Sequence, residues 1–300
     1  MLAACAMFAC MDASMKALAG HYPPLQVTAL RGLTSLPLVC LYIVWRRELG
    51  AVAGRHVRWG LHLLRGVIGV LMLALFTTGL RTLGLAEAYT LSFVAPLLIT
   101  ILAIPLLGEP VKPRHWTAIA VGFAGVVVAL RPSQAAFLSV GALAILGAAV
   151  GYSVFSVLGR LIGRTEPSSS LVLWTTVCMA VIGGALALPQ WVPVRAEHAL
   201  ILAGLAVSGF LGQLAISEAF RHGQAAAVAP FEYSALAWAM LIDWMFWHTV
   251  PDAWTLAGAA IIIASGIYLV RRELPTSTEA ARAEPRDPSP SRGSPSMSGD

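Results

Sequence analysis

The sequence is 300 residues long, and 58% of the residues are hydrophobic, only 12% are charged and the net charge at pH 7 is +5. A soluble globular domain carries roughly 25% charged residues, so this composition excludes an ordinary soluble protein. Helical spans of roughly 20 apolar residues account for nearly the whole chain from Leu2 to Val270. We therefore expect an all-α integral membrane protein whose cations mark topology and do not bind nucleic acid.

Apolar runs separated by glycine, proline and charge predict ten transmembrane helices. The first span contains Asp12 and Lys16 and has no basic segment before it, so we expect it to be retained and not cleaved as a signal peptide. The predicted spans are residues 2–19, 26–45, 60–80, 85–107, 114–130, 137–159, 170–188, 199–220, 225–247 and 253–270. Small residues that recur every four positions in 147–151 and 204–212 predict close helix crossings.

The distribution of Lys and Arg between the spans predicts the orientation. One set of connecting segments contains Arg46, Arg47, Arg55, Arg58, Lys112, Arg114, Arg160, Arg164, Arg221, Arg271 and Arg272, whereas the other contains Arg81, Arg131 and Arg195. The richer side is expected to be cytoplasmic, which places both termini inside a bacterial-type inner membrane. Residues 274–300 are rich in proline, serine and charge, a composition typical of a disordered tail.

No pattern in the chain predicts a metal, a cofactor or an enzyme. The four cysteines, Cys5, Cys10, Cys40 and Cys178, lie in apolar runs without a Cys-x-x-Cys spacing, and they are expected to act as small hydrophobic residues. A Walker A motif and an HExxH motif are also missing from the sequence.

The two halves of the sequence can be aligned with each other. Lys16 matches Arg160 and Pro23 matches Pro167, both at an offset of 144 residues (160−16 and 167−23). Each half contains five predicted spans, and an odd number of spans makes the second copy enter the membrane the opposite way up. The pattern is that of two inverted five-helix repeats, which in many transporters hold the substrate near the middle of the membrane.

Short motifs recur along the chain in a characteristic order: Lys16 with Pro23-Pro24, Leu30-Arg31-Gly32, Ala95-Pro96-Leu97, Gly108-Glu109-Pro110, the run 122–128, the run 229–234 and the run 266–273. In this order and spacing the chain resembles the drug/metabolite transporter superfamily, specifically its EamA-type ten-span carriers. The resemblance implies one EamA-like repeat in residues 1–131 and a second in residues 137–272. The sequence departs from the family pattern at two places. Trp247-His248-Thr249 stands where the family often repeats a Gly-Glu pair, and Thr175 is the counterpart of Arg31.

The resemblance implies a secondary transporter that moves a small metabolite by alternating access. Amino acids, S-adenosylmethionine, vitamins and similar zwitterionic or cationic compounds are the expected substrates. The lipid bilayer, protons as a coupling ion and a second copy of the chain in a homodimer are further candidate partners. A non-transporting or lipid-translocating membrane subunit is the first alternative, and an intramembrane enzyme is the second.

Polar residues inside the predicted spans are candidate substrate contacts, because charge at bilayer depth is costly. Asp12 and Lys16 are four residues apart and are expected to form an ion pair along one helix, either structural or facing the substrate. Glu232 and Asp243 are eleven residues apart (243−232), on one helical face. Both are candidate coupling residues, with Glu232 deeper and Asp243 near the outer end, within reach of water.

Prolines and aromatic residues complete the predicted site. Pro96 and Pro230 interrupt helical hydrogen bonding, so each is either a packing kink or a hinge at the cavity. The remaining candidate substrate contacts share a place inside a predicted span: Glu87, Phe93, Tyr152, Tyr233 and Trp238.

Overall fold

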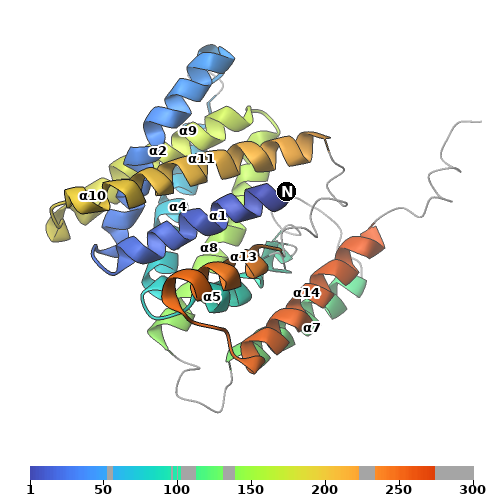
Figure 1. The fold of residues 1–300 in the computed structure, drawn as a ribbon. Coiled ribbons are helices and arrows are strands. Elements are labelled where there is room, and N and C mark those ends of the chain that lie inside the picture. Colours follow the sequence, from blue (N-terminus) through green and yellow to red (C-terminus); the bar gives the residue numbers. More distant parts are fainter. Residues whose placement is uncertain are drawn as a thin grey trace, which may run out of the picture.

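The structure, a computed structural model, describes residues 1–52, 57–95, 97–99, 101–102, 113–130, 139–222 and 234–273. Every regular element in these segments is a helix (Figure 1). Expectations for Pro96, Pro230, Glu232, Tyr233 and the tail from residue 274 lie outside the described residues.

Six helical segments of the described chain are long and apolar enough to cross a membrane. Four are single helices: α1 (Leu2–Ala19), α2 (Pro24–Arg46), α4 (Trp59–Leu80) and α8 (Val140–Gly163). The fifth, Ser168–Gln190, joins α9 (Ser168–Cys178), the π-helix η2 (Met179–Gly183), α10 (Gly184–Ala187) and η3 (Leu188–Gln190). The sixth joins η4 (Ala196–His198) to α11 (Ala199–His222), and a short helix, α3 (Leu49–Val52), lies between α2 and α4.

The other four predicted spans coincide with shorter apolar helices in the described residues. They are α5 (Leu85–Ser92), α7 (Pro113–Leu130), α13 (Ser234–Ile242) continued by the π-helix η6 (Asp243–Trp247), and α14 (Ala253–Glu273). The expected all-helical, membrane-type architecture is therefore confirmed, whereas the expectation of ten complete spans stays a prediction.

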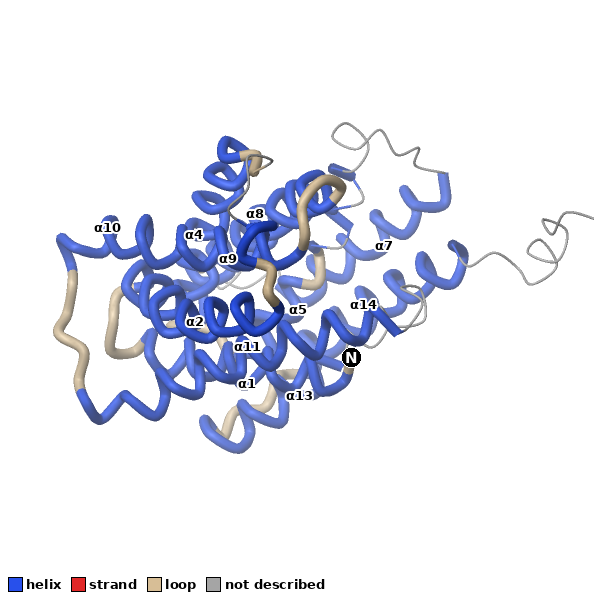
Figure 2. Tube along the Cα trace, turned by 90° about the horizontal axis from the view of Figure 1, so that it is seen from above, coloured by secondary structure: helices blue, strands red, loops and turns tan. Residues whose placement is uncertain are grey.

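Helices from the first half of the chain pack against helices from the second half. α1 packs on α11, α4 on α8, α2 on α9 and η2, α5 on α13, and α7 on α14. Figures 1 and 2 both show α7 and α14 side by side at the edge of the bundle. The expected close crossings are confirmed, because a Cβ on Gly151 would lie 2.8 Å from Met72 Cβ, and one on Gly212 would lie 3.1 Å from the Phe8 ring.

Two helix backbones approach each other closely where α2 meets η2. A Cβ added to Gly32 would lie 2.4 Å from the backbone nitrogen of Ala180, a separation that real atoms do not tolerate. Glycine at this position lets the two helices touch without an intervening side chain, as small residues do between membrane helices.

Two polar anchors join the halves at opposite ends of α4. At the end near Arg81, the Tyr22 hydroxyl lies 2.7 Å from His198 Nδ1 and accepts the Arg195 backbone N–H at 3.0 Å. Arg81 also contributes, because its guanidinium donates to the Ala19 and Tyr22 carbonyl oxygens at 2.8 and 3.2 Å. We call this group of contacts the Tyr22 anchor. The loop between α10 and α11 is thereby held on the hairpin between α1 and α2.

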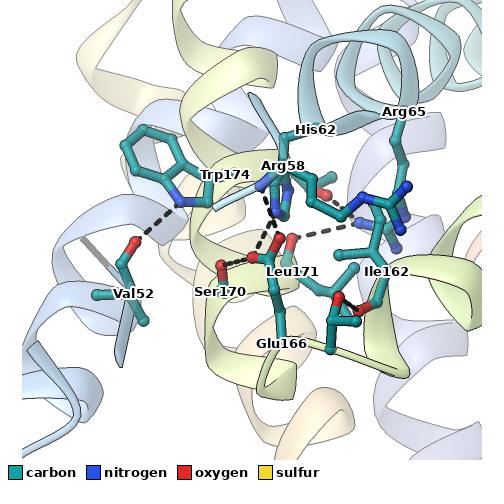
Figure 3. Close-up of polar contacts among 11 residues, drawn as sticks. Val52, Arg58, His62, Arg65, Ile162, Glu166, Ser170, Leu171 and Trp174 are labelled. Carbon is teal, nitrogen blue, oxygen red and sulfur yellow. Dashed lines mark hydrogen bonds and ion pairs between the residues drawn. The ribbon is translucent and has the colours of Figure 1, made fainter. Parts of the chain in front are cut away.

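The second anchor lies where α4 begins and is shown in Figure 3. Glu166 Oε1 accepts the Arg58 backbone N–H at 2.9 Å, while Oε2 lies 2.8 Å from His62 Nε2 and accepts the Ser170 hydroxyl at 2.8 Å. The His62 and Glu166 side chains are only 3% and 2% exposed. This Glu166 anchor therefore ties the α8–α9 hairpin to the start of α4 with a fully satisfied carboxylate.

Replacement of Gly32 by alanine should lower the melting temperature of the solubilised protein, because overpacking a tight contact costs about 1–3 kcal/mol. Gly184→Ala is the matched control, since Gly184 directly follows η2 on the segment that faces Gly32, and a Cβ there meets nothing within 4 Å. An unchanged melting temperature for Gly32→Ala would show that α2 and η2 separate without loss of stability.

Glu166→Gln should destabilise the protein in a pH-dependent way. Burial raises the pKa of the Glu166 carboxyl, but the hydrogen bonds from Arg58, His62 and Ser170 outweigh burial and leave the pKa below its ordinary value. The ionised carboxylate stabilises the fold above the unfolded-state pKa of about 4.3, and this contribution is lost as the pH falls through the folded-state pKa.

The melting-temperature difference between Glu166→Gln and the unchanged protein should therefore be largest near neutral pH and shrink below about pH 4.3. Glu197→Gln is the control, because that side chain is 63% exposed and its ion pair with Arg195 should contribute little. A difference that does not vary with pH would contradict the electrostatic account of the anchor.

Candidate functional site

A cavity of about 770 Å³ lies at the end of the bundle where α1 and α4 end and α5 begins. η6 and the residues that follow it complete the wall. Its polar and aromatic lining comes from α1, the α4–α5 turn, α5 and η6, and it includes Lys16, Arg81, Glu87, Asp243 and Trp247. The cavity therefore gathers residues that are as much as 235 positions apart, from Lys16 to Pro251 (251−16).

An ion pair between α1 and η6 lines this cavity. Lys16 Nζ lies 2.7 Å from Asp243 Oδ1, and the two side chains are 10% and 2% exposed. Asp243 Oδ2 accepts the Ala86 backbone N–H at 3.0 Å, where the first turn of α5 presents unpaired N–H groups. The same ammonium lies 4.3 Å from the centroid of a Trp247 ring, a cation–π contact. Both carboxylate oxygens of Asp243 are thus used within the protein.

The expected Asp12–Lys16 ion pair is wrong, because Lys16 pairs with Asp243. The expectation that Asp243 is within reach of water is also wrong, since its side chain in the cavity wall is only 2% exposed. Helix geometry allows Lys16 to meet a residue four positions away, but α13 packs on α1 and continues into η6, which brings the Asp243 carboxylate to 2.7 Å from Lys16 Nζ. The wider turn of η6 directs both Asp243 and Trp247 toward Lys16, and π-helical turns are frequent at functional sites.

Gly84 leaves room for this arrangement. A Cβ at Gly84 would lie 3.0 Å from Asp243 Oδ2, so a side chain here would press on the carboxylate. Glu87 accepts the Gly84 backbone N–H at 3.3 Å from the first turn of α5, and it also lines the cavity. The predicted site residues Lys16, Glu87 and Asp243 therefore meet in one place.

Asp12 lies one helical turn before Lys16 on α1, roughly 6 Å along the axis. Its Oδ2 accepts a hydrogen bond from the Tyr89 hydroxyl at 2.6 Å, and Arg31 on α2 interacts with it electrostatically. Tyr89 is not among the predicted site residues. The sequence feature that could have identified Tyr89 is a tyrosine inside an apolar run, because a buried phenol requires a hydrogen-bond partner.

Like Asp12, three further predicted substrate contacts lie away from this cavity lining. Phe93 follows the last residue of α5, Tyr152 is on α8 with 48% of its surface exposed, and Trp238 packs against the core on α13. Arg65 on α4 is not among the predicted site residues, yet its guanidinium stacks on Phe155 and donates to Leu171 O and Thr175 Oγ1.

Comparisons with known proteins agree with this architecture. The chain is 30% identical over 232 residues to a riboflavin transporter from Rhizobium johnstonii, with 76% of each chain aligned. It is 26% identical to an S-adenosylmethionine uptake transporter from Rickettsia prowazekii, over 79% of this chain and 78% of that protein. Pseudopaline exporter CntI from Pseudomonas aeruginosa is 25% identical over 88% of this chain and 92% of the exporter.

A solved crystal structure shares the fold with a TM-score of 0.58, at 22% identity, over 91% of this chain and 99% of the other. The profile of the EamA-like transporter family matches residues 1–131 and 139–272. These two segments include nearly all of the predicted helical region. The chain therefore belongs to the EamA-like transporter family, within the drug/metabolite transporter superfamily.

Proposed function

We propose that this protein is a secondary transporter that carries a small metabolite across the inner membrane by alternating access, and that its substrate is first held in the cavity beside Lys16 and Asp243. The observation that supports this most directly is the buried ion pair, 2.7 Å long, against an open cavity. Ionisable groups within membrane helices are costly and mark substrate or ion pathways. The named activities of the relatives, riboflavin transport, S-adenosylmethionine uptake and pseudopaline export, support a small-molecule cargo.

The cavity lining favours a zwitterionic or cationic metabolite. It contains cationic groups, Lys16 and Arg81, together with the carboxylates of Glu87 and Asp243. One oxygen of Glu87 is used by Gly84, which leaves acceptor capacity for an ammonium group of a substrate. Trp247 offers a ring on which a planar part of the substrate can stack.

Two inverted five-span repeats, residues 1–131 and 137–272, are part of this proposal. The pairwise packing across the halves supports it, and so do the two anchors. Tyr22 and Glu166 are also 144 residues apart (166−22), and each accepts a backbone N–H from the opposite half.

Both termini are proposed to be cytoplasmic, with a disordered tail after residue 273. A reporter that is active only in the periplasm should stay silent when fused after Leu274.

Transport by the purified protein in proteoliposomes tests the function. A thermal-shift screen of metabolites on the solubilised protein would select compounds, with S-adenosylmethionine and riboflavin included, and uptake or exchange of the radiolabelled compounds would then be measured. A carrier moves solute without any other protein, whereas a non-transporting subunit does not. A lipid-translocating protein would move labelled phospholipid instead, and an enzyme would change the compound chemically.

Lys16→Met should lower the melting temperature, because it leaves a buried carboxylate uncompensated, and such a loss costs about 3–5 kcal/mol. The double variant Lys16→Met, Asp243→Asn should recover most of this stability, because asparagine can still accept the Ala86 N–H. Uptake per molecule should stay about tenfold or more below that of the unchanged protein, as expected for charges on a transport pathway. Recovery of both stability and uptake in the double variant would give the pair a structural role only.

Glu232 is our candidate for a proton-coupling residue, because it lies two residues after Pro230 in a predicted span. Glu232→Gln imitates the protonated carboxyl without a change of shape. This variant should lose the pH dependence of uptake in proteoliposomes and retain substrate exchange. Uptake with unchanged rate and pH dependence would remove Glu232 from the mechanism.

A further inference from the structure

The carboxylate of Asp243 and the ring of Trp247 form two walls of a cation site in the cavity. Asp243 Oδ1 lies 2.7 Å from Lys16 Nζ, and the same nitrogen lies 4.3 Å from the centroid of a Trp247 ring. A carboxylate beside an aromatic face is a combination that binds ammonium and quaternary ammonium ligands in proteins. Here the side chain of Lys16 occupies that combination, and all three residues line the cavity.

The carboxylate is held in position by contacts that do not involve Lys16. Its other oxygen, Oδ2, accepts the Ala86 backbone N–H at 3.0 Å. A Cβ on Gly84 would lie 3.0 Å from the same oxygen, so the carboxylate is packed closely against the start of α5. These contacts keep the carboxylate of Asp243 in place when the cation at Oδ1 changes.

Lys16 is better suited to leave its partner than the arginine of the lining. Its ammonium is a point charge at the end of a flexible side chain. Among the described residues, this ammonium donates a hydrogen bond to Asp243 alone, and the side chain already borders the cavity. The guanidinium of Arg81, by contrast, is bonded to the carbonyl oxygens of Ala19 and Tyr22 at 2.8 and 3.2 Å.

We propose that the Lys16 ammonium is an internal occupant of this site, and that an ammonium or sulfonium group of the substrate displaces it from Asp243 and Trp247. The inference rests on the proposed transport function and narrows its substrate to organic cations, including zwitterions. In the carrier without substrate, Lys16 neutralises the buried carboxylate and avoids the cost of an unpaired charge. When substrate binds, the ammonium turns into the cavity, whose lining also includes the Glu87 carboxylate.

Competition with Lys16 makes the site selective for positive charge. A neutral group in the place of the ammonium would leave the buried Asp243 carboxylate unpaired, which is strongly unfavourable. A substrate cation instead replaces one ion pair with another and keeps the contact with the Trp247 ring. An uncharged compound therefore gains no access to the carboxylate.

Lysine modification tests the displacement in the unchanged protein. The sequence contains two lysines, Lys16 and Lys112, so peptide mass spectrometry can follow each one separately during reductive methylation. Choline is the probe cation, and its uncharged carbon isostere dimethylbutanol is the control. Choline should accelerate modification of Lys16 about tenfold, because the ammonium loses its bond to the carboxylate. Modification of Lys112 should not change, and dimethylbutanol should alter neither rate.

The direction of the effect is diagnostic. Choline bound elsewhere in the cavity would shield Lys16 and slow its modification, whereas choline on Asp243 releases the amine and speeds it. A slower or an unchanged rate at Lys16 overturns the displacement. This experiment needs no variant, so it decides the question even if substitutions at Lys16 prevent folding.

Choline binding to variants, measured by thermal shift, tests the same site from the side of the ligand. Lys16→Met removes the internal competitor, so half-saturation should occur at an about tenfold lower choline concentration. The double variant Lys16→Met, Asp243→Asn should lose choline binding. Trp247→Leu should weaken binding about fivefold, while its matched control Trp247→Phe retains a ring and most of the affinity. Unchanged affinity in Lys16→Met, or binding retained in the double variant, contradicts the assignment.

The two proposals fail in different ways. If choline accelerates modification of Lys16 but the purified protein moves no solute in proteoliposomes, the transport function is wrong and the cation site stands as a binding site. If solute is transported and choline does not accelerate modification, the transport function stands and the displacement is wrong. Uptake of riboflavin, which has no cationic group, would overturn the restriction to cations and leave the transport function intact.

Discussion

The buried carboxylate of Asp243 is the constraint around which the cavity is organised. With 2% of its side chain exposed, it must be neutralised within the protein, and three separate elements contribute to this. α1 supplies the ammonium of Lys16, α5 supplies the Ala86 N–H from its first turn, and Gly84 leaves the space that this approach requires. Removal of any one of these contributions would leave charge unsatisfied in an environment of low polarity.

The helices that carry these groups are held by contacts of another kind. α2 and η2 meet at Gly32 with backbone against backbone, and α4 and α8 meet where Gly151 faces Met72. In lipid there is no hydrophobic drive between helices, so close packing of small residues and satisfied polar groups must stabilise the bundle. The Tyr22 and Glu166 anchors provide such polar contacts at the two ends of α4.

The polar side chains on successive turns of α1 contact different elements of the bundle. Lys16 pairs with Asp243 on η6, and each oxygen of that carboxylate already has a partner within the protein. Asp12, one turn earlier on α1, accepts the Tyr89 hydroxyl of α5 at 2.6 Å. Charges at bilayer depth are costly, so such contacts are required to hold these side chains inside the helical bundle.

Composition and periodicity by themselves determined the class of this protein, because only helices satisfy their own backbone groups in lipid. They also located the helical regions and singled out Asp12, Lys16, Glu87 and Asp243, since charge inside an apolar run is visible without a structure. Glu232 and Tyr233 lie outside the described residues and stay predictions. The family resemblance followed from short motifs whose order is a property of the chain alone.

Only the tertiary structure decided how these charges pair. A sequence shows neighbours along one helix, so it offered Lys16 the partner at Asp12, four residues away. The partner that Lys16 has, Asp243, is 227 residues away, and it reaches Lys16 because α13 packs on α1 and continues into η6. Tyr89 and Arg65 were missed for the same reason, because the strength of a polar contact depends on which groups folding removes from water.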